Sequence, residues 1–135
     1  AAFIIAAILY SVIKKQEREA GQIKKVEVVE FALKEQNASG LTGKATLVEA
    51  AENTEVTVTV TNLFPGSNRP AHIHRGSCEA LGEVLYPLSN AKGGLSETVI
   101  NTSIFDILKQ IPLVINVHES EENAGTYVAC GNFPQ

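Results

Sequence analysis

Val56-Thr57-Val58-Thr59-Val60-Thr61 is the stretch that decides the fold class, because apolar and hydroxyl side chains alternate in it without a break. Successive side chains of a β-strand point to opposite faces, so the three valines share one face and the three threonines share the other. This period of two predicts a half-buried strand, with its valines in a core and its threonines in water.

The chain beyond Gly21 continues in the same way, with short β-branched runs separated by turn residues. Lys44–Ala50 and Glu55–Asn62 are close enough in sequence to pair as a hairpin. Ser103–Gln110 differs, because a serine start, apolar residues at helical spacing and a proline just beyond predict one short helix. The expected strands are Ile23–Leu33, Lys44–Ala50, Glu55–Asn62, Pro70–Arg75, Val84–Leu88, Ser96–Thr102, Leu113–His118 and Thr126–Phe133. Eight short strands at such spacing predict an all-β domain, a Greek-key barrel or sandwich.

Composition indicates one small globular domain that does not bind nucleic acid. The 135 residues are 44% hydrophobic and 19% charged, which suits a single packed core. The formal net charge is −4, and Lys14, Lys15 and Arg18 form the one basic cluster. A chain that grips phosphates needs a larger basic surface than this.

The N-terminus predicts a separate hydrophobic helix over residues 1–21, ahead of a β-domain over residues 22–135. Ala1–Ile13 carries no charge, and Lys14–Ala20 would continue the helix until Gly21 ends it. Thirteen helical residues reach about 20 Å, short of the roughly 30 Å hydrocarbon core. We interpret the segment as the end of a signal-anchor helix in membrane lipid, which predicts a membrane-anchored domain in the periplasm or at the cell surface. The alternatives are an uncleaved signal-peptide core and a helix buried against subunits of a filament or membrane complex.

His72-Ile73-His74 is a candidate metal site, because residues two apart on a strand present their side chains on the same face. His118, at the end of another expected strand, could supply a third imidazole. Three imidazoles with an open position suit one copper or zinc ion. The alternative is that these histidines are polar residues on the wet face of two strands, without any metal.

Five short motifs between Ile23 and Phe133 together resemble the copper/zinc superoxide dismutase family. They are Asn62-Leu63-Phe64-Pro65-Gly66, Pro70-Ala71-His72-Ile73-His74, Val117-His118-Glu119, Asn123-Ala124-Gly125 and Ala129-Cys130-Gly131. The resemblance implies that family's eight-stranded Greek-key barrel and copper held by the three histidines. It also implies a disulfide between Cys78 and Cys130, although two distant cysteines could otherwise be free buried thiols. A disulfide of this kind indicates an oxidising compartment.

The departures from that family fall on its chemistry. No histidine remains for the family's copper–zinc bridge or second zinc site, and Tyr127 stands where the family has an anion-attracting arginine. Tyr127 and Glu119 are expected at the rim of the metal site, where the acidic stretch Glu119–Asn123 would repel an anion. These departures favour a catalytically degenerate, membrane-tethered binding or structural module, or an accessory subunit of a larger assembly, over an enzyme. The alternatives are a copper-binding protein for storage, delivery or buffering, and a residual copper-only superoxide dismutase.

Overall fold

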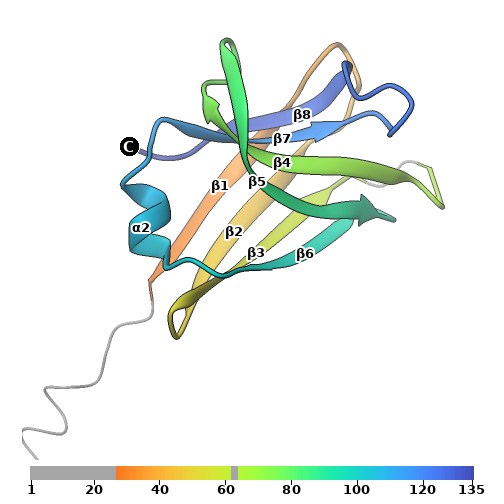
Figure 1. The fold of residues 1–135 in the computed structure, drawn as a ribbon. Helices are drawn as coiled ribbons and strands as arrows, with labels where there is room; N and C mark the ends of the chain where they lie inside the picture. The colour runs from red at the N-terminus through yellow and green to blue at the C-terminus, as the bar shows by residue number, and fades with distance from the viewer. Residues whose placement is uncertain (1–26, 62–63) are drawn as a thin grey trace, which may run out of the picture.

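The computed structural model describes residues 27–61 and 64–135, and in them eight strands form one closed barrel in which every pairing is antiparallel (Figure 1). The strands are β1 (Val28–Glu35), β2 (Gly43–Ala50), β3 (Asn53–Val60), β4 (Asn68–Gly76), β5 (Leu81–Lys92), β6 (Leu95–Ile100), β7 (Leu113–His118) and β8 (Tyr127–Asn132). One short helix, α2 (Ile104–Leu108), connects β6 to β7. The expected all-β class and eight-stranded barrel are confirmed.

The strand order around the barrel is β1-β2-β3-β6-β5-β4-β7-β8. Three neighbouring pairs are not consecutive in sequence, since β1 pairs with β8, β3 pairs with β6 and β4 pairs with β7. The connections from β3 to β4 and from β6 to β7 therefore cross between distant strands, as they do in Greek-key folds. This topology places β7 beside β4 and so brings His118 next to the strand that carries His72 and His74.

The core is filled by the inward faces of the strands. Val56, Val58 and Val60 of β3 are buried, while Thr57 is half-buried and Thr59 is exposed, as the alternating pattern predicts. Helix α2 adds Ile104 and Ile107 to the same core at one end of the barrel (Figure 1). Burial of such apolar side chains is the main term that stabilises a domain of this size.

Strand β7 is unusual because all six of its residues are buried. Leu113, Ile115 and Val117 belong to the core cluster, so the alternate residues Val114, Asn116 and His118 lie on the outer face of the barrel. That outer face must therefore be covered by other parts of the chain. The loop after His118 contributes one such group, the Ala124 carbonyl that bonds to His118.

Side chains close the barrel where the ladder between β5 and β6 is short. Only Lys92 and Leu95 are paired there by backbone register. Ser96 Oγ donates to the Ser89 carbonyl at 2.5 Å, and the Ser89 amide donates to Thr98 Oγ1 at 2.9 Å. Hydroxyls thus satisfy backbone groups that a regular ladder would have paired.

Most strand ends differ from the sequence-based expectation by one or two residues, and β5 differs by more. The sequence predicts β5 over Val84–Leu88, but the strand runs over Leu81–Lys92, and its pairing with β4 contains register shifts. Strand β1 extends to Glu35, where its last two residues pair with β8. The expected N-terminal helix over residues 1–21 lies outside the described residues, and among residues 27–61 and 64–135 no helix has the length and apolar character to cross a membrane.

Candidate metal centre

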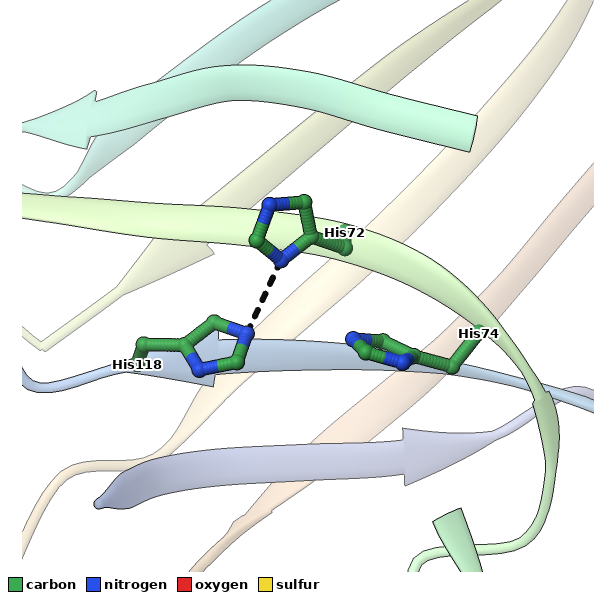
Figure 2. Close-up of side chains that lie close together, drawn as sticks. All are labelled: His72, His74 and His118. Atoms are coloured by element: carbon green, nitrogen blue, oxygen red, sulfur yellow. Dashed lines mark hydrogen bonds between the residues drawn. The ribbon is translucent and has the colours of Figure 1, made fainter. Parts of the chain in front are cut away.

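Three histidines from two neighbouring strands meet on the outer face of the barrel. His72 and His74 lie on β4 with the fully buried Ile73 of the core between them, so both imidazoles point outward. His118 is the last residue of β7, which pairs with β4. Figure 2 shows the three rings facing one another across this strand pair.

Two backbone carbonyls fix the orientation of two of the rings. His118 Nδ1 lies 2.6 Å from the Ala124 carbonyl oxygen, and His74 Nδ1 lies 3.0 Å from the Gly82 carbonyl oxygen. A carbonyl can only accept, so Nδ1 carries the proton in both histidines and Nε2 keeps its lone pair in the neutral ring. A hydrogen bond from the second ring nitrogen to a carbonyl is also how proteins orient metal-ligating histidines.

Ring nitrogens of the three histidines lie close together. One ligand atom from each histidine can be chosen so that all of them lie within 4.8 Å of one another. His72 Nδ1 lies 2.9 Å from His118 Nε2, and because that Nε2 accepts, His72 Nδ1 is the donor in this contact (Figure 2). His74 Nε2 is buried and has no hydrogen-bond partner. Within the described residues this is the one group of three or more such side chains close enough to hold an ion.

The surroundings favour the neutral form of His72 and of His118. Burial lowers the pKa of His72 below its ordinary value, and the neighbouring His118 and His74 lower it further. Burial also lowers the pKa of His118, against the raising effect of its bond to the Ala124 carbonyl. Neutral imidazole is the form that binds a metal, so this environment favours the binding-competent state near neutral pH.

The two residues expected at the rim take different places. The Tyr127 ring packs edge-on against His118, with centroids 5.2 Å apart, and so borders the centre. Glu119 is exposed, and its carboxylate accepts from Asn123 Nδ2 rather than joining the histidines. Glu121 is the carboxylate that affects the centre, because its charge raises the pKa of both His72 and His118 while it accepts from Asn90 Nδ2.

Cys78 and Cys130 form a disulfide with an S–S distance of 2.10 Å. It joins the start of the β4–β5 turn to β8, and the Cys78 amide also donates to Asn132 Oδ1 at 2.9 Å. Cys130 lies opposite Asn116 in the β7–β8 register, and Asn116 lies opposite His72 in the β4–β7 register. Cys130 is therefore on the strand next to that of His118, and two strands away from that of His72 and His74.

A family model described as the CHRD domain matches residues 25–126. The chain belongs to the CHRD domain family. No curated protein matches the chain, and no solved structure matches it.

Membership of the CHRD family shows that the inferred resemblance to copper/zinc superoxide dismutase is wrong. The motifs behind that inference are short, and those that the structure describes combine core residues of the barrel, such as Ala71, Ile73 and Val117, with the clustered histidines. They therefore indicate a barrel with clustered histidines, which is correct, but do not identify a family. The functions built on the resemblance fall with it: the degenerate dismutase module or accessory subunit, the copper storage, delivery or buffering protein, and the residual dismutase.

Sequence reasoning missed the groups of the CHRD domain that support the three histidines. The Gly82 and Ala124 carbonyls are backbone atoms, and neither residue type gives a signal for its role. Glu121 belongs to an acidic stretch that the sequence shows, but its proximity to the rings depends on the fold of the loop. Asn116 has a weak signal, since it is the one polar residue in the apolar run before His118.

Proposed function

We propose that this CHRD domain is a binding module that holds one zinc or copper ion between His72, His74 and His118. The observation that carries the proposal is His74 Nε2, a buried ring nitrogen without a partner on one of the three clustered histidines. A buried polar atom is costly when it is unpaired, so such atoms mark places where a water, an ion or a ligand completes the structure.

The chemistry of the donor set supports zinc or copper. Three neutral imidazoles are nitrogen donors of intermediate softness, which suit these two ions, whereas calcium and magnesium prefer oxygen. The hydrogen bonds to Gly82 and Ala124 hold two rings with Nε2 available, so part of the ordering cost is met before an ion binds. Three protein donors also leave room in a four-coordinate ion for a further ligand.

The disulfide supports an oxidising compartment for the domain. Disulfides persist in secreted, periplasmic and cell-surface proteins and are rare where thiols are kept reduced. We therefore place the module outside the cytoplasm, in the periplasm or at the cell surface. Attachment through residues 1–21, to membrane lipid or to subunits of a complex, stays a prediction.

Metal analysis of protein purified without a histidine tag tests the proposal. We expect the chelator-treated protein to take up one equivalent of zinc sulfate or copper sulfate in a dialysis or calorimetric titration. His74→Gln should abolish tight binding, because it removes the ring with the unpaired buried nitrogen. Glu119→Gln is the matched control, since it changes a nearby charge that does not join the histidines, and it should bind as the wild type does.

Two results would refute the metal proposal. One is folded wild-type protein that takes up neither ion. The other is a His74→Gln variant that binds zinc and copper with unchanged affinity, since the ion would then be held elsewhere.

A further inference from the structure

Asn116 is a buried polar residue that the three-histidine site does not yet explain. Its side chain is 1% exposed, and its Oδ1 atom has no hydrogen-bond partner. Across residues 27–61 and 64–135, only one other buried side-chain oxygen or nitrogen is unpaired in this way, and that atom is His74 Nε2. The two unpaired atoms belong to residues on neighbouring strands of the same sheet.

The register places Asn116 at the middle of the histidine cluster. Asn116 lies directly opposite His72 in the β4–β7 ladder, and His118 follows it by two residues on the same strand. His74 lies opposite Val114, so it is the diagonal neighbour of Asn116. Side chains that are opposite, diagonal or two apart on one face are the nearest neighbours in a sheet. Asn116 is therefore a neighbour of all three histidines on this face.

We propose that Asn116 Oδ1 is the fourth protein donor of this centre, so that the bound ion has three nitrogen ligands and one oxygen ligand. The proposal rests on the metal-binding function above and adds which ions the centre prefers. An amide oxygen is a hard donor, which favours divalent zinc or Cu(II) over the softer Cu(I). The bound ion would then be the partner of both unpaired buried atoms, His74 Nε2 and Asn116 Oδ1.

Two variants at this position test the assignment. Asn116→Leu keeps the approximate shape but removes the oxygen, whereas Asn116→Asp keeps an oxygen and adds negative charge. Zinc affinity is measured by competition with a chromophoric chelator, and Cu(I) affinity by competition under reducing, oxygen-free conditions. We expect Asn116→Leu to lose about tenfold or more in zinc affinity, as other changes beside metal ligands do, with little change for Cu(I). Asn116→Asp should bind zinc at least as tightly as the wild type.

A spectroscopic measurement covers the case in which Asn116→Leu does not fold. The electron paramagnetic resonance spectrum of Cu(II)-loaded Asn116→Asp should differ from that of the wild type in its g values and copper hyperfine coupling, because the oxygen ligand changes from amide to carboxylate. An identical pair of spectra would overturn the assignment.

The outcomes separate this proposal from the one on which it rests. Folded Asn116→Leu with wild-type zinc affinity would overturn the role of Asn116 and leave the three-histidine site standing. Wild-type protein that binds neither zinc nor copper would overturn both.

Discussion

His72 and His118 are the residues whose chemistry the fold changes most clearly, because burial lowers the pKa of both imidazoles. In the unfolded chain a histidine has a pKa near 6.5. Between the lowered value and about 6.5 the unfolded state binds more protons than the folded state, so acid favours unfolding. We therefore expect the metal-free protein to keep the full contribution of these groups above about pH 6.5 and to lose it as the pH falls.

Urea denaturation in the presence of a chelator, at about pH 7.5 and about pH 5.5, measures how the free energy of unfolding depends on pH. Both pH values lie above the ordinary pKa of carboxylates, so the carboxylates contribute little to the difference. The free energy of unfolding should be lower at the acidic value. The double variant His72→Gln/His118→Gln should show a weaker dependence, because both titrating groups are gone. Stability that rises on acidification would contradict the pKa shifts of the two histidines.

For individual residues, the sequence predicts the metal-ligating side chains better than it predicts the groups around them. His72 and His74 could be placed on one face from their spacing alone, since alternation is a local property of strands. The Gly82 and Ala124 carbonyls could not be predicted, because any residue carries a carbonyl and only the folded loops decide where it points. The role proposed for Asn116 needs the β4–β7 register, which joins segments far apart in the sequence.

At the scale of elements, the contact of β8 with β1 depends on a glycine. A Cβ at Gly131 would lie 2.7 Å from Leu33 Cδ2 and closer still to the Ala32 carbonyl oxygen, and backbone cannot yield as easily as a side chain. We expect Gly131→Ala to lower the free energy of unfolding by about 1–3 kcal/mol through overpacking. Gly125→Ala is the matched control, because a methyl group at that position would have no other atom within 4 Å. Chemical denaturation of both variants checks this, and equal stabilities would refute the packing argument.

The stability of helix α2 should depend on the side-chain hydrogen bond that caps its N-terminus. Ser103 is its N-cap and accepts from the Asp106 amide at 3.1 Å, and the helix has only five residues to share the cost of an uncapped end. Ser103→Ala should cost about 1 kcal/mol of stability, whereas Ser103→Thr keeps the hydroxyl and most of the stability. Thermal melting distinguishes them. If alanine and threonine variants melt together below the wild type, the hydroxyl is not the cause.

Elements with strong local signals were predictable, and elements set by tertiary contacts were not. The β3 alternation and the serine that starts α2 both act within a few residues, and the structure has a strand and a helix there. The full length of β5 could not be predicted, because its ends depend on pairing with β4 rather than on a local sequence signal. The β4–β5 pairing contains register shifts, and these depend on residues in both strands.

At the scale of the whole molecule, the Greek-key order places together residues that are distant in sequence. The rings of His72 and His118 meet across 46 residues, and Cys78 and Cys130 are joined across 52. Such long-range contacts leave much conformational freedom in the unfolded chain, which folding must remove. A disulfide removes part of that freedom in advance.

The Cys78–Cys130 disulfide should therefore make a large contribution to the stability of the barrel. For a closed loop of this size the chain-entropy estimate is about 4 kcal/mol, against roughly 5–15 kcal/mol for a typical domain. We expect Cys78→Ala/Cys130→Ala to remain folded at about 25 °C in dilute buffer but to unfold at a clearly lower urea concentration. Because the variant has no thiols, added reductant should lower the midpoint of the wild type towards that of the variant and leave the variant unchanged. A wild-type midpoint that is insensitive to reductant, after complete reduction is shown by thiol titration, would mean that strand pairing alone holds β8 against the β4–β5 turn.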